Sequence, residues 1–560
     1  MPFSRKKFLF WIIVITAVCC AALRVDVMDT DAAQYAEISR EMVSSHQWLQ
    51  VHDLGKDYLD KPPFTFWACS ISMSIFGVNN FGYKLPSLLF ALLAIWSAFR
   101  LATLFYPEAV AALSALVLAS SQGFFLMTND CRTDTILMGA VAFGFWQFAE
   151  FDLRGKPRNL VLAALGIGVG MLTKGPIALL VPVFGFGTHF ILTRQYRKLF
   201  RPSYLVALGI ILVMLLPMAI GLYRQFDLHP EKLVNGQRGV SGLKFYFWTQ
   251  SFGRITGQSN WDNHAGFAFL AKNMLWTFFP WCLVFFVAWG YRVFQALRNR
   301  KVRVPSGKEW ICLGGFTLTY ISLGLSHYQL PHYIFIVFPL AAILTGRFIY
   351  ELVTEEKLRS LLRWLRGVQY VLIVIGFGTA FLLCGWAFLP RSAGYWTLAA
   401  LTIGFVLVFF ISGKSPYGWV LRCLWAMVLI NLILNGYIYP KLLHFEMGSV
   451  AGRWVADHRV PPGRFYVLGV PNQSRSLNFY SRRIVPVLEN PDSLKEMKGD
   501  RFILTDSGHL ASLKGEGGSV VLSGSDYGVS LLTGRFLNPG TRAGTTRPYF
   551  LVRVRSGVGD

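Results

Sequence analysis

The chain has 560 residues, of which 54% are hydrophobic and 15% are charged. A soluble protein usually carries about a quarter charged residues, so the composition excludes an ordinary soluble enzyme. It also excludes a disordered polycation, despite a net charge of +24, because such a chain could not contain so many long apolar runs. We therefore expect a polytopic membrane protein.

Thirteen apolar stretches are candidates for transmembrane helices, which need about 20 apolar residues each. The first, Phe8 to Leu23, follows three basic residues as a signal peptide would. No small-residue cleavage site leads from it into a secreted domain, so we expect an uncleaved anchor. The other twelve are expected at residues 84–105, 108–128, 135–150, 159–173, 176–193, 203–222, 271–291, 310–325, 333–348, 368–388, 395–412 and 417–438.

Basic residues recur in alternate connections between these stretches, and this pattern predicts the orientation. Clusters occur at residues 154–158, 194–201, 298–303 and 357–366. The opposite connections carry almost none, namely Arg132, Lys174 and Arg391. Because Lys and Arg favour the cytoplasmic side, we expect a cytoplasmic amino terminus and, with an odd count, a carboxyl-terminal tail outside. The basic residues form no single patch, so membrane lipid is an expected partner and nucleic acid is not.

Three outer segments are too long or too polar to be plain turns: residues 24–83, 223–272 and 440–560. We expect residues 1–439 to form a transmembrane domain and residues 440–560 a separate small domain. In the tail, a helical stretch at 448–458 precedes β-rich runs at 464–470, 483–488, 501–505, 519–522 and 549–554. Gly, Ser and Asn separate these runs, which predicts an α/β or β-rich fold.

Charged residues near the outer ends of the apolar stretches are the first candidates for a site. Asp31 begins a helical pattern, where it either complements the helix dipole or takes part in chemistry. Lys61 would lie at headgroup height, where its ammonium either meets a lipid phosphate or anchors the segment. Asp134 begins a span, where an acid is costly unless it is functional or paired. The alternative to a functional role is a local pair, either Asp134–Arg132 or Asp130–Arg132.

Further outer segments carry polar residues of the same kind. Lys174 lies in a tight turn, where capping a helix end is its simplest role. Arg254 lies among aromatic residues, which suits the phosphate of an amphipathic ligand and equally an interfacial belt. His327 and His332 lack a third well-spaced ligand, so hydrogen bonding is a simpler explanation than metal binding. Together these residues predict a polar site at one membrane face, suited to chemistry on a lipid phosphate.

Several motifs resemble those of a known family. They are the run from Asp31 to Met42, Asp60-Lys61-Pro62, Leu172-Thr173-Lys174-Gly175 and Leu330-Pro331-x-Tyr333. In order and spacing they are similar to the bacterial lipid A aminoarabinose transferases. With the protein O-mannosyltransferases, these are type C glycosyltransferases. The resemblance covers residues 24–350 and implies thirteen spans, juxtamembrane helices in the first outer segment, a periplasmic tail domain and location in the bacterial inner membrane.

The resemblance also implies roles for individual residues. It makes Asp31 and Asp134 the catalytic acids, and it makes Lys61, Arg254 and Tyr333 the groups that hold the phosphate of a polyprenyl (undecaprenyl) carrier. Additional candidates are Asp60, Lys174, His264 and Tyr35.

Three departures from the family pattern bear on cofactor and substrate. Asp60 stands where the family has Glu and, with His264, resembles a metal site of the family. A divalent metal is therefore a candidate cofactor, although we assign no metal ligand. Ala32 stands where the family commonly has an acid, and the run Ser326 to Gln329 stands where it usually has lysines. These two departures leave the identity of the sugar open.

The expected reaction is a single inverting displacement that moves a sugar from the carrier to lipid A or another envelope glycolipid. Asp31 would orient or deprotonate the acceptor, while Lys61 and Arg254 would offset charge on the departing phosphate. A protein O-mannosyltransferase is the alternative within enzymes. A lipid-carrier flippase or transporter is the alternative outside them, but such proteins usually have internal repeats and charge near the bilayer midplane, and we find neither.

Overall fold

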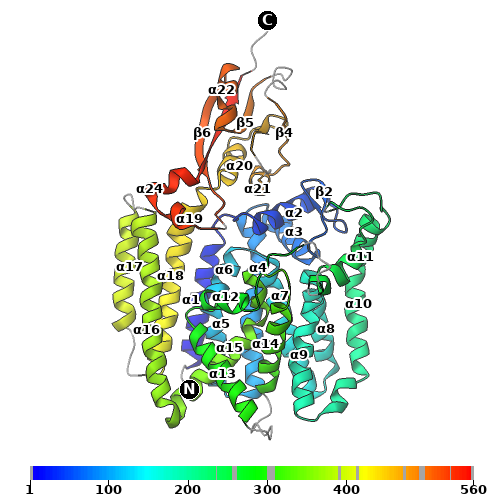
Figure 1. The fold of residues 1–560 in the computed structure, drawn as a ribbon, viewed down its shortest axis with the longest axis vertical. Coiled ribbons are helices and arrows are strands. Elements are labelled where there is room, and N and C mark those ends of the chain that lie inside the picture. Colours follow the sequence, from blue (N-terminus) through cyan, green and yellow to red (C-terminus); the bar gives the residue numbers. More distant parts are fainter. Residues whose placement is uncertain are drawn as a thin grey trace.

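The computed structural model describes residues 4–234, 236–254, 256, 261–298, 309–388, 393–410, 415–470, 474–490, 499–529 and 531–555. Part of the predicted basic connection at 298–303, and Arg391, lie outside the described residues. The structure has two visible parts, a broad layer of long helices and a smaller sheet-containing part beyond one end of it (Figure 1). The amino terminus lies at the opposite end of the helical layer (Figure 1).

Apolar sequences form the helical layer, since in a bilayer each segment has to satisfy its own backbone hydrogen bonds. The helices of this layer are α1 (Arg5–Ala22), α4 (Asn80–Phe105), α5 (Glu108–Ala119), α6 (Gln122–Asn129), α7 (Thr133–Arg154), α8 (Pro157–Lys174), α9 (Ile177–Leu192), α10 (Ser203–Leu222), α12 (Phe269–Thr277), α13 (Cys282–Arg298), α14 (Glu309–Gly324), α15 (Phe338–Thr354), α16 (Arg359–Leu382), α17 (Ala393–Phe410) and α18 (Gly418–Ile433).

Helices overlap all thirteen of the predicted apolar stretches. Within the described residues, six helical segments are long and apolar enough to cross a membrane. A seventh is obtained if α5 and α6, which meet at a bend of 54°, count as one span. The class of multi-pass helical membrane protein is therefore confirmed, while the count of thirteen spans remains a prediction.

Close helix contacts set the position of α7, which carries the candidate residue Asp134 in its first turn. A side chain at Gly139 of α7 would collide with the backbone of Phe90 in α4, and one at Gly166 of α8 would collide with the backbone of α7. These glycines let α7 pack directly against both neighbours. The outer ends of α7 and α8 are thereby brought together.

The first outer segment lies across the end of the helical layer that faces the sheet (Figure 1). It contains α2 (Asp31–Ser45), the short hairpin β1 (His52–Asp53) and β2 (Lys56–Asp57), and α3 (Phe64–Phe76). The Ser70 hydroxyl of α3 donates a hydrogen bond to the Ser39 carbonyl of α2 at 3.0 Å. The expected helix from Asp31 is present, and a second helix of 13 residues follows Pro63.

The middle outer segment has little regular structure. Its helical turns are η2 (Tyr223–Asp227), α11 (Gly242–Lys244), η3 (Phe245–Thr249) and η4 (Phe252–Arg254), and η5 (Pro331–Val337) precedes α15. The candidate residue Arg254 is the last residue of η4.

The carboxyl-terminal part is a mixed five-stranded sheet with helices on both faces. Its strands are β3 (Phe465–Leu468), β4 (Val487–Leu488), β5 (Arg501–Asp506), β6 (Ser519–Asp526) and β7 (Arg547–Val554), in the order β4-β3-β5-β7-β6. β3 is parallel to β4 and β5, and β7 is antiparallel to β5 and β6. Each predicted β-rich run overlaps one of these strands, and β5, β6 and β7 extend beyond the predicted ranges.

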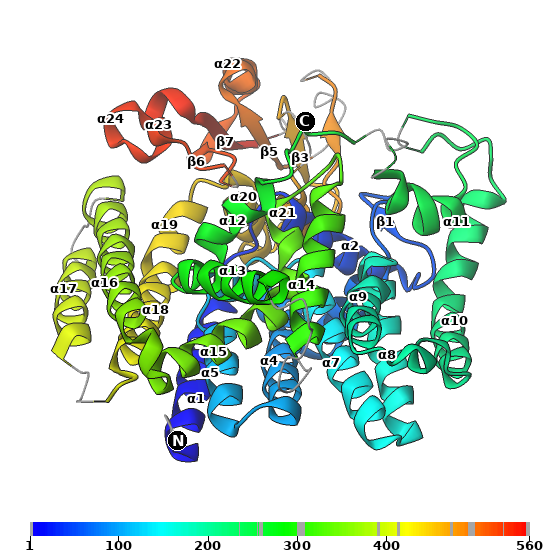
Figure 2. The ribbon, with the colours of Figure 1, turned by 60° about the horizontal axis from the view of Figure 1, so that its bottom comes forward.

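The helices of this part are α19 (Tyr439–Leu443), α20 (Met447–Asp457), α21 (Arg475–Ser481), α22 (Ser507–Gly515), α23 (Gly534–Leu537) and α24 (Pro539–Arg542). One sheet face packs on α20 and α21, through residues such as Val455 and Leu477. The other face packs on α22 through Leu513. In both views the sheet lies beyond the ends of the long helices (Figure 2).

Candidate functional site

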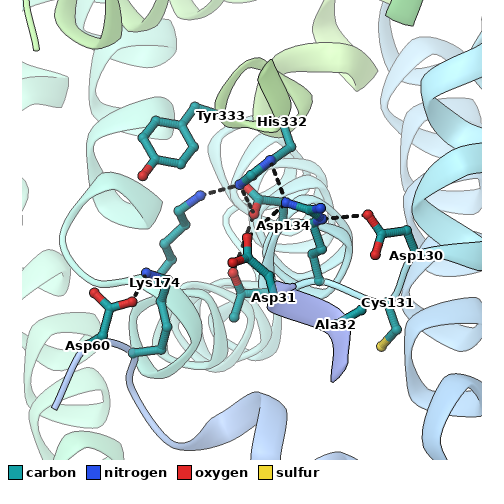
Figure 3. A network of polar contacts seen from close by, with 12 residues as sticks. Asp31, Ala32, Asp60, Asp130, Cys131, Asp134, Lys174, His332 and Tyr333 are labelled. Atoms are coloured by element: carbon teal, nitrogen blue, oxygen red, sulfur yellow. Dashed lines mark hydrogen bonds and ion pairs between the residues drawn. The ribbon is translucent and has the colours of Figure 1, made fainter. Parts of the chain in front are cut away.

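Asp31, the first residue of α2, is held by an arginine from the connection between α6 and α7 (Figure 3). Nη1 of Arg132 donates to Oδ2 of Asp31 at 2.8 Å, and Nε donates to Oδ2 of Asp130 at 2.6 Å. The local Asp130–Arg132 pair that the sequence allows is therefore present. The same guanidinium also connects the amino end of α2 to the amino end of α7.

Asp134 lies in the first turn of α7, and its side chain is only 2% exposed. Its Oδ1 accepts a hydrogen bond from Nζ of Lys174, the last residue of α8, at 2.5 Å. Its Oδ2 lies 3.6 Å from Nε2 of His332. The ion-pair partner of Asp134 is therefore Lys174, and not Arg132 as the sequence suggests.

Three residues of the predicted phosphate site lie on a second side of this network. Arg254 donates from Nη1 to the Tyr333 hydroxyl at 2.8 Å, and its Nη2 is 4.0 Å from Oδ1 of Asp60. Nζ of Lys61 donates to Oδ2 of Asp60 at 2.6 Å. The ammonium of Lys174 lies 3.9 Å from the centre of the Tyr333 ring, which joins the two sides.

Aromatic rings surround Arg254, as its sequence environment predicts. The guanidinium carbon is 4.7 Å from the ring centre of Trp261 and 5.2 Å from that of Tyr328. These contacts fix the plane of the guanidinium and shield it from water, and the residue is only 7% exposed. A planar cation in this environment is suited to binding an oxyanion.

A cavity of about 90 Å³ opens between these groups. Its polar lining includes Lys61, Lys174, Gln250, Arg254 and Tyr333. Its apolar lining includes Leu137, Ile177, Leu180, Leu323 and Ile336. Three cations beside an apolar wall can bind an anionic group that is attached to a hydrocarbon chain.

The structure therefore brings most of the candidate residues together, in two different ways. Lys61, Lys174, Arg254 and Tyr333 line the cavity directly. The carboxylates of Asp60 and Asp134 are joined to this group through ion pairs with Lys61 and Lys174. Asp31 instead pairs with Arg132, which is connected to Asp134 through His332 (Figure 3).

Two candidate residues lie apart from the cavity. Tyr35 is buried against Phe66, with ring centres 5.7 Å apart. Burial, helped by the charge of Asp31, raises the pKa of Tyr35 well above its usual range, so the hydroxyl stays neutral and the residue acts as a packing group. The His264 side chain is 92% exposed and contacts Asp262 at 3.3 Å.

The candidate metal site does not fit a metal. The oxygens of Asp60 already accept hydrogen bonds from Lys61 and Gln250, and His264 points into solvent. In the part of the chain that the structure describes, no three His, Cys, Asp or Glu side chains gather as ligands. We derive no step that uses a metal.

Sequence reasoning missed the roles of Arg132, His332 and Gln250. Arg132 was considered only as a local partner for neighbouring acids, although it contacts Asp31, 101 residues away. A usable signal for His332 was its position beside Tyr333 in the Leu-Pro-x-Tyr motif.

Comparison with known proteins gives matches in sequence and in fold. Residues 60–220 match the family described as dolichyl-phosphate-mannose-protein mannosyltransferase. The undecaprenyl phosphate-α-4-amino-4-deoxy-L-arabinose arabinosyl transferase of Edwardsiella ictaluri is 29% identical over 360 residues, covering 62% of this chain and 61% of that protein. The enzyme of the same name from Erwinia tasmaniensis is 31% identical, over 45% of this chain and 44% of that protein. The chain thus matches less than two thirds of the length of these relatives.

Among solved structures, ArnT from Cupriavidus metallidurans bound to undecaprenyl phosphate superimposes with a TM-score of 0.71. The match covers 97% of both chains at 18% identity. The chain has an ArnT-like type C glycosyltransferase fold. The resemblance predicted from the motifs is therefore confirmed, and the apo structure of the same ArnT agrees, with a TM-score of 0.69.

Proposed function

We propose that the protein is an inner-membrane glycosyltransferase that moves a sugar from a polyprenyl phosphate carrier to an acceptor at the outer membrane face. The cavity lined by Lys61, Lys174, Arg254 and Tyr333 is the observation that carries this proposal. Its cations suit a phosphate and its apolar wall suits a hydrocarbon chain. The relatives in sequence are undecaprenyl phosphate-α-4-amino-4-deoxy-L-arabinose arabinosyl transferases, which supports the same chemistry.

In the reaction we infer, an acceptor oxygen attacks the anomeric carbon, and the bond from that carbon to the carrier phosphate breaks. Asp31 orients the acceptor or removes its proton, and the polyprenyl phosphate leaves with the bonding electron pair. Lys61 and Arg254 stabilise the charge that grows on the departing phosphate, an effect worth several kcal/mol when the donors are preorganised. Attack from the opposite face inverts the anomeric configuration.

We infer that the acceptor is lipid A or another envelope glycolipid. If its attacking group is itself a phosphate, little base strength is needed, and Asp31 mainly positions it. A protein acceptor is the second candidate, since residues 60–220 match a protein mannosyltransferase family. The two are separated by whether a labelled sugar ends in lipid or in polypeptide.

We also propose the finer topology. Thirteen spans within residues 1–439, with periplasmic loops at 24–83 and 223–272, would place the amino terminus in the cytoplasm. The domain at residues 440–560 would then be periplasmic. The clusters of basic residues in alternate connections support this orientation.

Substitution of Asp31 by Asn tests the proposal. We expect the variant to fold in detergent but to transfer no sugar from labelled polyprenyl phosphate sugar, because the amide lacks the carboxylate charge and basicity. Asp457→Asn, at an exposed position of the carboxyl-terminal domain, is the matched control and should transfer normally. Wild-type turnover by Asp31→Asn would remove Asp31 from the reaction.

A further inference from the structure

His332 lies between the two ion pairs of the network (Figure 3). Its Nδ1 is 3.2 Å from Nη1 of Arg132, and its Nε2 is 3.6 Å from Oδ2 of Asp134. Its side chain is 12% exposed. The residue comes from η5, whereas both of its neighbours come from the start of α7, so the imidazole connects two elements that are far apart in the chain.

The neighbours of the ring determine where its hydrogen lies. A guanidinium can only donate hydrogen bonds, so Nδ1 has to present its lone pair to Arg132. The hydrogen of the neutral ring is then on Nε2, on the side of the Asp134 carboxylate. A second hydrogen on Nδ1 would point directly at the guanidinium, so this geometry requires the neutral form of His332.

The ring also separates two cations that are both attracted to Asp134. Lys174 already pairs with this carboxylate, and Arg132 lies on the other side of the ring. The same Nη1 of Arg132 contacts both His332 and Asp31. If the ring nitrogens were absent, Nη1 of Arg132 would lose one of its two acceptors and could turn from Asp31 toward Asp134, while Nε stays paired with Asp130.

We propose that His332 is a positioning residue that keeps Arg132 on Asp31 and leaves Asp134 to Lys174. His332 is not among the residues that line the cavity, so it does not contact the carrier phosphate. Its effect should therefore appear in the rate of transfer and not in the binding of the donor. This inference rests on the proposed function, because it assumes that Asp31 acts on the acceptor.

The test replaces His332 with Phe, which keeps a planar ring but has no nitrogen, and with Gln, whose amide can accept from Arg132 and donate to Asp134. Because small misplacements of a reacting group cost up to about 100-fold in rate, we expect kcat of His332→Phe to fall about 10- to 100-fold. The donor KM should stay within about 2-fold, since that binding site is intact. His332→Gln should recover most of the lost kcat. His327→Phe, at a histidine that is 54% exposed and lies in the connection just before η5, is the matched control and should behave as the wild type.

Several outcomes overturn the inference. One is wild-type kcat in a folded His332→Phe protein, and another is a folded His332→Gln protein that is no more active than His332→Phe. A purely structural role would lower thermal stability and raise the donor KM together with the loss of rate, which also contradicts it. Should His332→Phe not fold, His332→Leu takes its place. If the wild type itself does not transfer sugar, the proposed function fails first, and this inference fails with it.

Discussion

Lys174 and Asp134 form a buried ion pair between the last residue of α8 and the first turn of α7. Their side chains are 14% and 2% exposed, and the ion pair joins α8 to α7. A buried pair of this kind adds little stability overall, because both charges lose water. Removing only one partner is costly, since it leaves the other charge uncompensated.

We predict that Lys174→Met and Asp134→Asn each destabilise the protein, by about 3–5 kcal/mol where a buried charge is left alone. The double variant should recover much of this loss, because it buries no unpaired charge. It should still transfer no sugar, because the cavity has lost a cation and the network has lost its acid. Thermal unfolding in detergent and transfer assays on all three variants measure the two effects separately. Additive losses of stability in the double variant would contradict the prediction.

Charge and position along the chain were sufficient to single out the three cations that line the cavity, Lys61, Lys174 and Arg254. Lys61 and Tyr333 occupy motif positions, and Arg254 is a cation among aromatic residues in the middle segment. Their partners were not predictable in the same way. The contact between Arg132 and His332 joins residues 200 positions apart, and no local pattern specifies such a pair.

At the scale of elements, the segment before α2 is held by the carboxyl-terminal domain. The Asp29 amide donates to Oε1 of Glu446 at 2.9 Å. Arg475 pairs with Asp53 at 2.9 Å, and the Tyr480 hydroxyl accepts from the Val27 amide at 2.8 Å. Because α2 starts two residues after Asp29, these contacts help to set the position of Asp31.

The acids in this contact make it sensitive to pH. Burial, followed by the charge of Asp526, raises the pKa of Asp29 from its usual value of 3.8 to about 6, although Arg475 opposes the shift. Burial and the charge of Asp29 raise the pKa of Glu446 well above its usual range. The native state therefore holds a proton on Asp29 that the unfolded chain has already lost. Its contribution to stability is full below pH 3.8 and is lost as the pH rises through about 6.

We accordingly predict that Asp29→Asn stabilises the protein at pH 7.5 more than at pH 5, because the amide carries no charge at either pH. The gain should be a few degrees in Tm, measured by thermal unfolding in detergent across this range. Asp457→Asn, at an exposed position in the same domain, should show no such difference. An equal effect of Asp29→Asn at both values would mean that Asp29 ionises as an ordinary carboxylate does.

Elements differ in how well the sequence predicts them. The strands of the small sheet coincide with the predicted runs because β-branched and aromatic residues alternate with turn residues there. The span count is harder to predict. The apolar stretch at 108–128 is divided by the bend between α5 and α6, and the one at 271–291 is divided between α12 and α13. Apolar composition alone does not reveal such breaks.

At the scale of the whole molecule, the sheet and the first outer segment, in which α2 begins at the candidate residue Asp31, lie at one end of the helical layer, with the amino terminus at the other (Figure 1). A reaction on a lipid headgroup needs this arrangement, because the carrier's hydrocarbon chain stays in the bilayer while its phosphate reaches the edge. The orientation also determines which compartment supplies the acceptor. The side of the membrane on which each terminus lies therefore tests both the topology and the proposed function.

We predict that a reporter fused after residue 560 lies outside the cytoplasm and that one fused before residue 1 lies inside it. Alkaline phosphatase, which is active only in the periplasm, should be active at the carboxyl terminus. Green fluorescent protein, which does not fluoresce when exported unfolded, should fluoresce only at the amino terminus. An odd number of spans, such as thirteen, requires termini on opposite sides, whereas twelve or fourteen would place both on the same side. A fluorescent carboxyl-terminal fusion would therefore contradict the proposed orientation and would move the cavity to the cytoplasmic face. Fluorescence of both fusions would also contradict the odd count.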